Sequence, residues 1–119
     1  STLSAAERAA GFTPGNAPPP VVTTPLGSLG LLCGVEGLVP TLVAGLAERG
    51  ATTVAWSAGD LGVPVEPLAR ARAIETGRTV IAAGMAAPLG GGSVIDARGT
   101  VLATTVEGQA MAALAEIRA

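Results

Sequence analysis

The chain has 119 residues, of which 49% are apolar and 13% are charged, with a formal net charge of −2. This length is enough for one small domain, and the apolar content excludes a disordered chain. The slight excess of acidic residues excludes an electrostatic nucleic-acid surface and a polybasic membrane anchor, so the expected partners are small molecules or proteins, with no nucleic acid and no membrane.

Turn-forming residues and short apolar runs divide the first half of the chain. Residues 1–20 contain a proline-rich run and are predicted as an irregular arm. The apolar runs at residues 21–24 and 28–33 predict two strands. Pro40 suits the first turn of a helix whose apolar residues follow helical spacing, and Gly50 ends that helix.

The second half continues the alternation of strands and helices. Residues 66–76 open with an acidic residue and predict a second helix, which Gly77 closes. Because strands and helices alternate before a final group of strands, we predict an α/β layered domain over residues 21–119, with two helices and a mixed sheet. The remaining strands are predicted at residues 52–56, 79–85, 93–96, 101–105 and 110–117. The alanine-rich composition of the last segment leaves a helix as the alternative there.

The residue types that the chain lacks narrow its chemistry. It contains no His and no Tyr, so no Ser-His-Asp triad can form within it. Its single cysteine, Cys33, can form neither an internal disulfide nor a structural zinc site, and we expect no metal and no cofactor. A lone thiol fits a cytoplasmic protein. Prolines and glycines interrupt the uncharged stretch 9–35, so we expect no signal peptide and no spanning helix.

Cys33 is the residue most suited to covalent chemistry. It lies at the end of a predicted strand beside Gly34, where a strand-to-helix turn can expose a nucleophile. The alternative is a small buried hydrophobic residue, which is the more common role of a lone cysteine. A reactive thiolate needs a base or a cation nearby, and an arginine or one of Glu7, Glu36 and Glu75 would have to supply it.

Two other segments have simpler interpretations. The glycine run at residues 90–92 has no following Lys and precedes a strand, so we interpret it as a turn rather than a phosphate loop. The predicted second helix carries a charged face, which we interpret as solvated or as forming interface salt bridges. This face consists of Arg70, Arg72, Glu75 and Arg78.

Several segments together resemble the later half of the carbon-nitrogen hydrolase, or nitrilase, superfamily. FTPGN at residues 12–16 resembles the loop before the family's nucleophile strand, and TPLGSLGLL at 24–32 resembles that strand. Residues 40–58 are similar to the helix and strand that follow the nucleophile. ARARAIETGR at 69–78 resembles the family's Arg-Ala-x-Glu-Asn helix, and GSVIDARG at 92–99 resembles its hairpin. The resemblance covers nearly the whole chain.

The resemblance implies a nitrilase-like α-β-β-α sandwich of which this chain, residues 1–119, is the C-terminal half in a single partial domain. It also implies chemistry by a Cys nucleophile, a Glu base and a Lys that holds the tetrahedral intermediate. The Glu and the Lys precede the segment seen here, with the lysine falling just before Ser1. Glu7 matches a second glutamate that some members carry.

A gap-free register over residues 27–32 places the family's nucleophile on Gly34, one residue after Cys33. Cys33 would then point to the opposite face, because side chains alternate along a strand. A one-residue bulge would return it to the pocket. By resemblance, the candidate site comprises the catalytic residues Cys33 and Glu7 and the pocket residues Gly34, Glu36 and Ser57.

A free half-sandwich would expose a sheet edge and an apolar layer, which predicts a homodimer or a complex with a chain carrying the upstream half. We therefore predict a homologue or fragment of the superfamily that does not hydrolyse amides by itself. The alternative is an active amidase or nitrilase in which Cys33 forms a thioester from a small amide or nitrile, with Glu and Lys supplied from outside this chain. A third hypothesis is a structural or regulatory subunit.

Overall fold

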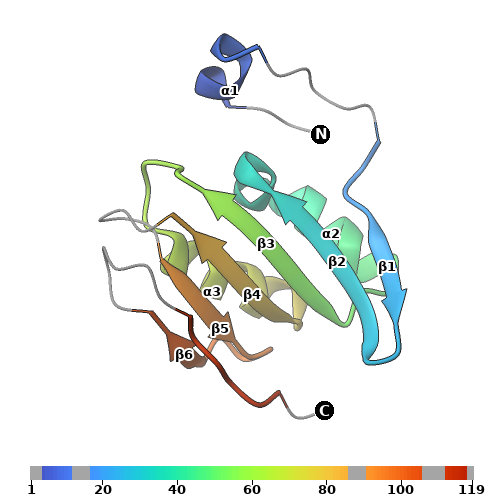
Figure 1. Cartoon of the computed structure of the whole chain (residues 1–119). Coiled ribbons are helices and arrows are strands. Elements are labelled where there is room, and N and C mark those ends of the chain that lie inside the picture. The colour runs from blue at the N-terminus through green and yellow to red at the C-terminus, as the bar shows by residue number, and fades with distance from the viewer. Residues whose placement is uncertain (1–3, 12–16, 86–90, 106–111, 118–119) are drawn as a thin grey trace.

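Six of the seven predicted strands join into one mixed sheet, drawn in Figure 1. The computed structural model describes residues 4–11, 17–85, 91–105 and 112–117. Within these residues, six strands are hydrogen-bonded in sequence order. The central three run parallel, and the outer pairings are antiparallel. The strands are β1 (Val21–Thr24), β2 (Gly27–Cys33), β3 (Thr53–Gly59), β4 (Thr79–Gly84), β5 (Gly92–Ile95) and β6 (Val101–Thr104).

The two predicted helices are confirmed, and both use the predicted boundary residues. Helix α2 (Pro40–Glu48) begins at Pro40, in the first turn, where the missing N–H has no intrahelical partner to lose. Helix α3 (Val65–Thr76) ends at Gly77, whose φ of 63° is left-handed. The Gly77 N–H donates to Ala73 O at 2.9 Å and closes the last turn.

The prediction of an irregular arm over residues 1–20 is wrong in one part, because a short helix, α1 (Ala5–Ala9), forms there. The Glu7 N–H donates to Ser4 Oγ at 3.1 Å, and the Ser4 N–H donates to Glu7 Oε1 at 2.9 Å. This reciprocal pair is a capping box, which satisfies backbone donors that the first turn of a helix leaves free. Local hydrogen bonding therefore starts a helix in a segment whose prolines come later.

Two predicted strands differ from the structure by more than one residue at an end. β3 continues to Gly59, past the predicted end at Trp56, because its last residues pair with β4 through an irregularity in the register. The predicted tail strand is wrong for residues 112–117, which form no strand, while residues 110–111 lie outside the described residues. Ile117 is the single β-branched residue of that stretch, so its strand propensity is low.

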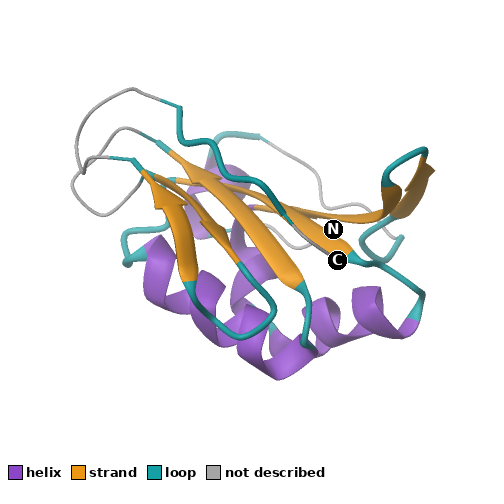
Figure 2. Ribbon diagram, turned by 90° about the horizontal axis from the view of Figure 1, so that it is seen from below, coloured by secondary structure: helices purple, strands orange, loops and turns teal. Residues whose placement is uncertain are grey.

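Helices α2 and α3 cover the same face of the sheet, as Figure 2 shows. Each links two neighbouring parallel strands, and such crossovers are almost always right-handed. Because β2, β3 and β4 follow one another in a single direction across the sheet, both crossovers place their helix on the same side. The core forms between this face and the helices. Its largest fully buried side chains are Trp56, Leu46, Ile95, Val43, Val54 and Val80.

The other face of the sheet, which we call the open face, has no helix over its central strands in the described part of the chain. Leu31 on this face is 36% exposed, and Cys33 further along β2 is exposed as well. On the neighbouring strands, Ala55 and Ile81 are half-buried. An uncovered apolar sheet face is typical of a surface that packs against another protein layer.

A charged residue on the open face tests this interpretation. We expect the purified chain to self-associate through this face, because association removes its apolar surface from water. Leu31→Glu should shift the chain towards monomer in sedimentation velocity. The matched control is Leu26→Glu, since Leu26 is 99% exposed in the turn between β1 and β2. Equal association of the Leu31→Glu variant and the unmodified chain would contradict the interpretation.

Candidate functional site

β2 ends in a tight turn that contains three of the predicted site residues. Cys33 is the last residue of β2, and Gly34 begins the 3-10 helix η1 (Gly34–Leu38). Gly34 has a φ of 58°, in the left-handed region that strains residues with a Cβ. The Cys33 N–H donates to Glu36 Oε1 at 2.8 Å, and Trp56 Nε1 donates to Gly34 O at 2.8 Å. Two side chains thus fix the start of the turn.

The thiol of Cys33 is exposed, so the alternative of a small buried hydrophobic residue is wrong. The side chain lies at the end of β2 on the open face. Cys33 is the register partner of Ser57 in the parallel strand β3, and Ser57 is also exposed. The sheet therefore brings the thiol and the hydroxyl of these two predicted site residues to neighbouring positions.

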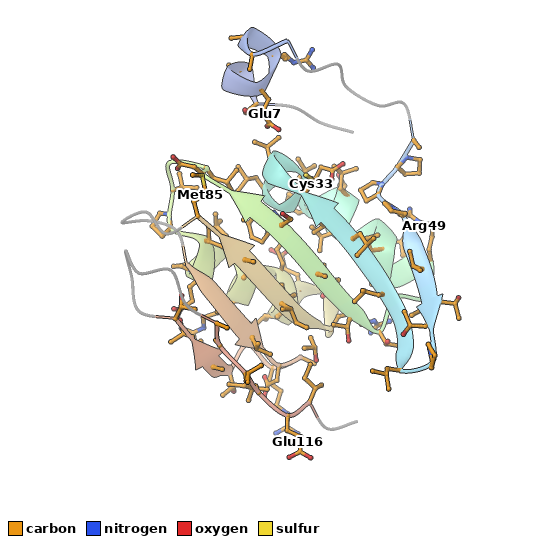
Figure 3. All side chains as sticks on the ribbon, viewed as in Figure 1. Glu7, Cys33, Arg49, Met85 and Glu116 are labelled. Atoms are coloured by element: carbon orange, nitrogen blue, oxygen red, sulfur yellow. The ribbon has the colours of Figure 1, made fainter. Side chains whose placement is uncertain are left out.

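Glu7 lies opposite Gly34. A Cβ placed on Gly34 would stand 3.5 Å from Glu7 Oε1 and 3.7 Å from Glu7 Oε2. In Figure 3, the Glu7 side chain extends from α1 towards the end of β2, where Cys33 is labelled. A side chain at position 34 would therefore start out towards a carboxylate.

The Glu7 carboxylate is held in its charged form. Hydrogen bonds from Ser4, first from its backbone N–H and then from its side chain, lower the pKa of Glu7 below its ordinary value, and desolvation opposes them. A carboxylate with a lowered pKa is an anion and a hydrogen-bond acceptor at neutral pH, but a weak base. Glu7 therefore combines a capping role in α1 with a fixed negative charge facing Gly34.

Glu36, the third predicted pocket residue, is buried, with 4% of its surface exposed. Its carboxylate accepts the Cys33 N–H within the turn, so this contact positions the backbone.

Among the residues that the structure describes, no three His, Cys, Asp or Glu side chains come together as a metal site would require. None of the described helices is long and apolar enough to cross a membrane.

The charged face of α3 differs from the prediction. Arg72 is only 7% exposed, so the interpretation as a solvated face is wrong for this residue. It forms an ion pair with Glu75 at 3.0 Å. Arg70 and Arg78 donate through Nε to backbone carbonyls in the loops before β6 and β3, at 2.9 and 2.7 Å. These acceptors lie in distant loops and have no signature in the sequence.

Comparison with known proteins assigns the chain to a family. The model of the carbon-nitrogen hydrolase family matches residues 4–119. The chain belongs to the carbon-nitrogen hydrolase family. A comparison with curated proteins found no match. The resemblance in the sequence is therefore confirmed at the level of the family.

Solved structures of carbon-nitrogen hydrolases share this fold. The NitN amidase from Nesterenkonia sp. AN1 superposes with a TM-score of 0.77 and is 29% identical, covering 89% of this chain and 45% of the amidase. A Cys-to-Ala mutant of the Nesterenkonia amidase in complex with butyramide gives a TM-score of 0.76 at 28% identity, covering 89% and 44%. The chain thus spans less than half the length of these amidases.

A third structure describes chemistry at a cysteine of that amidase. It is a Glu-to-Leu mutant that shows covalent addition of the acetamide moiety of fluoroacetamide at the active-site cysteine, with a TM-score of 0.76, 28% identity and coverages of 89% and 44%. The predicted α/β fold is confirmed by this likeness, as a mixed sheet with helices that matches about half of a nitrilase-superfamily amidase.

Acid should release the cap that Glu7 forms with Ser4. Because the pKa of Glu7 is lowered in the folded chain, its charged form stabilises α1 above the ordinary glutamate pKa, and this contribution is lost as the pH falls through the lowered value. We expect the Ser4 amide signal in NMR spectra to titrate with a midpoint below the ordinary glutamate range. In the control Glu7→Gln, that titration should vanish. A midpoint at or above the ordinary range would contradict the assignment.

Proposed function

We propose that this chain forms part of a carbon-nitrogen hydrolase sandwich and does not hydrolyse amides on its own. The observation that carries the proposal is the combination at residue 34. Its backbone is left-handed at a strand-to-helix turn, and its Cβ direction meets the Glu7 carboxylate, yet the residue is glycine. The place where the family register puts the nucleophile therefore has no side chain to react.

The conformation of Gly34 supports this register. A nucleophile at a sharp strand-to-helix turn occupies a strained backbone position, which exposes its reacting atom above the end of the sheet. Gly34 has such a backbone, whereas Cys33 is still part of β2 and pairs in register with Ser57. We assign position 34, rather than position 33, to the reacting side chain of the family.

The charges of the chain also support the proposal. The resemblance requires a lysine to hold the tetrahedral intermediate, and the seven cationic residues of this sequence are all arginines. Four of them, Arg49, Arg70, Arg72 and Arg78, donate to backbone carbonyls. The lysine that the resemblance requires would then come from outside these 119 residues.

The open face fits a chain that works with a second layer. Its apolar residues on β2, β3 and β4 have no helix over them in the described part, and the chain spans less than half the length of the matching amidases. We propose that the rest of the sandwich, or a second copy of this chain, packs on the open face. Burial of this face would close the space around Cys33 and Ser57.

The alternative function is an active amidase that uses Cys33, which the exposure of its thiol favours. The thiolate would attack the carbonyl carbon of a small amide, the C–N bond would break, and ammonia would leave with a proton. Water would then hydrolyse the thioester, releasing the acid and restoring the thiol. The Glu and Lys of the family would come from outside this chain.

Amide turnover by the purified chain tests the proposal that it does not hydrolyse amides on its own. We expect the purified chain to release no more ammonia from butyramide than the Cys33→Ala variant does, because the reacting side chain and the lysine are both missing. Intact mass spectrometry should find no acyl adduct at Cys33. Ammonia release that disappears in the Cys33→Ala variant would contradict the proposal and support the active amidase.

Moving the thiol tests the assignment of position 34. In a Cys33→Ala, Gly34→Cys variant, the Glu7 charge should raise the pKa of the thiol, and adding Glu7→Gln should lower it by roughly half to one pH unit, as for charges about 4 Å apart in water. The pH dependence of alkylation by iodoacetamide measures this pKa.

The matched comparison introduces Glu7→Gln into the unmodified chain. There, the pKa of the Cys33 thiol should change less than the pKa of the thiol at position 34. Circular dichroism checks folding, because a left-handed non-glycine residue costs roughly 1–2 kcal/mol. If Glu7→Gln changed the thiol pKa more at Cys33 than at position 34, the assignment of the family's nucleophile to position 34 would be overturned.

A further inference from the structure

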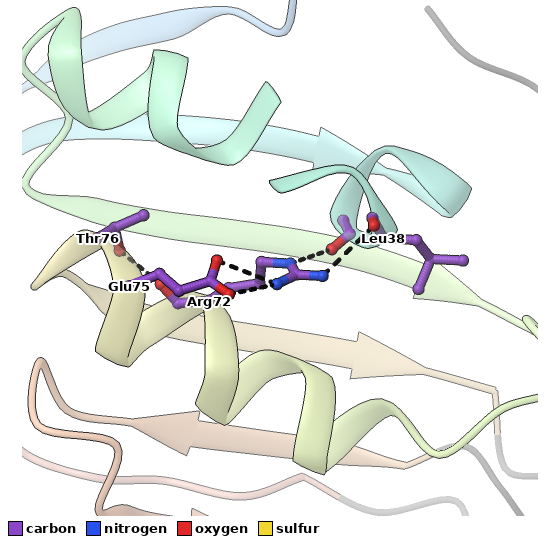
Figure 4. A network of polar contacts seen from close by, with 5 residues as sticks. Leu38, Arg72, Glu75 and Thr76 are labelled. Atoms are coloured by element: carbon purple, nitrogen blue, oxygen red, sulfur yellow. Dashed lines mark hydrogen bonds and ion pairs between the residues drawn. The ribbon is translucent and has the colours of Figure 1, made fainter. Parts of the chain in front are cut away.

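The C-terminal end of η1 depends on a side chain from another helix. The Val39 N–H donates to Glu36 O at 3.1 Å, and the next carbonyls, Gly37 O and Leu38 O, lie in the last turn, where a helix supplies no donors. Arg72 supplies them, with Nε donating to Gly37 O at 2.9 Å and Nη2 donating to Leu38 O at 3.4 Å. Figure 4 shows the guanidinium lying between α3 and these carbonyls.

The Arg72 guanidinium has a hydrogen-bond partner on each of its three nitrogens. Nη1 contacts the two carboxylate oxygens of Glu75 at 3.0 and 3.1 Å, which leaves Nε and Nη2 for η1. The residue is 7% exposed, and a buried guanidinium is tolerated only when its donors are satisfied. A lysine at this position could not reproduce the planar fork that reaches two successive carbonyls.

The start of η1 is fixed from β3, so the turn is held at both ends. Trp56 donates to Gly34 O, and its indole ring lies where a side chain at residue 37 would stand, so Gly37 is required for this contact. Trp56 acts on the first carbonyl of the turn, and Arg72 acts on the last two. Between them, these contacts set the path of the backbone from Gly34 to Leu38.

We propose that Arg72 is a positioning residue that fixes the turn after β2 and, through it, the backbone direction at Gly34. Its relation to the site rests on the proposed function, because position 34 is there assigned to the reacting side chain of the family, which this chain lacks. We call the hydrogen bonds of Arg72 to Gly37 O and Leu38 O the clamp, and the clamp is independent of that assignment. Arg70 provides a matched comparison, because it lies on the same helix and donates to Gly99 O, in the β5–β6 turn, at 2.9 Å.

Amide hydrogen exchange tests the clamp. In Arg72→Met, we expect the Val39 amide, which caps the end of η1, to exchange roughly tenfold faster or more, as for the loss of hydrogen bonds from a charged donor. The Gly99 amide, which donates to Asp96 O at 3.0 Å, should keep its rate. Arg70→Met should produce the opposite pattern. A residue that contributes only to overall stability would accelerate both amides together, and that result would overturn the proposal.

Two further measurements keep the test decisive. Arg72→Lys keeps the charge and the aliphatic stem, so it serves if Arg72→Met does not fold. Trp56 is the one tryptophan of the chain. We expect acrylamide to quench its fluorescence more strongly in this variant and to the same extent as in the unmodified chain in Arg70→Lys. Unchanged Trp56 quenching together with unchanged Val39 exchange in Arg72→Lys would overturn the proposal.

The link to the site is tested separately. In the Cys33→Ala, Gly34→Cys background, we expect Arg72→Lys to abolish the effect of Glu7→Gln on the thiol at position 34, because the turn no longer holds that thiol against Glu7. If this effect is absent before Arg72 is changed, the assignment of position 34 fails while the exchange pattern still decides the clamp. If the effect survives Arg72→Lys, the positioning role is overturned.

Discussion

The order of the strands is the constraint on which the rest of this structure depends. Three parallel strands follow one another without reversal, so both crossover helices lie on one face, and no helix lies over the central strands of the other face in the part of the chain that the structure describes. The C-terminal ends of β2 and β3 meet at the same edge of the sheet, which is where Cys33, Gly34 and Ser57 lie. The site and the need for a second layer thus have the same topological origin.

Much of the fold could be predicted because the chain marks its own boundaries. Pro40 and Gly77 begin and end helices for local steric reasons, and apolar runs of strand length lie between such residues. The helix at Ala5–Ala9 also had a local signal, the Ser4-x-x-Glu7 capping box, which the proline-rich run after it obscured. The tail had no comparable signal, because its alanines favour neither a strand nor a turn.

The candidate site was only partly within reach of the sequence. The register that places the family's nucleophile on Gly34 follows from the pattern of neighbouring residues. The left-handed backbone at Gly34 and the approach of Glu7 are visible only in the three-dimensional structure. The roles of Trp56 and Arg72 were missed for the same reason. Their acceptors are backbone carbonyls far along the chain, and every residue type presents the same carbonyl, so no motif records the partner.

The arginines give the fold a form of cohesion that differs from a network of ion pairs. Four of them connect segments distant in sequence by donating to peptide carbonyls, at Pro19, Gly37, Ala51 and Gly99. A peptide carbonyl does not titrate, and an arginine stays charged throughout the physiological range. These links therefore persist under acidic conditions that would neutralise carboxylate partners, and added salt screens them less than it screens exposed pairs of full charges.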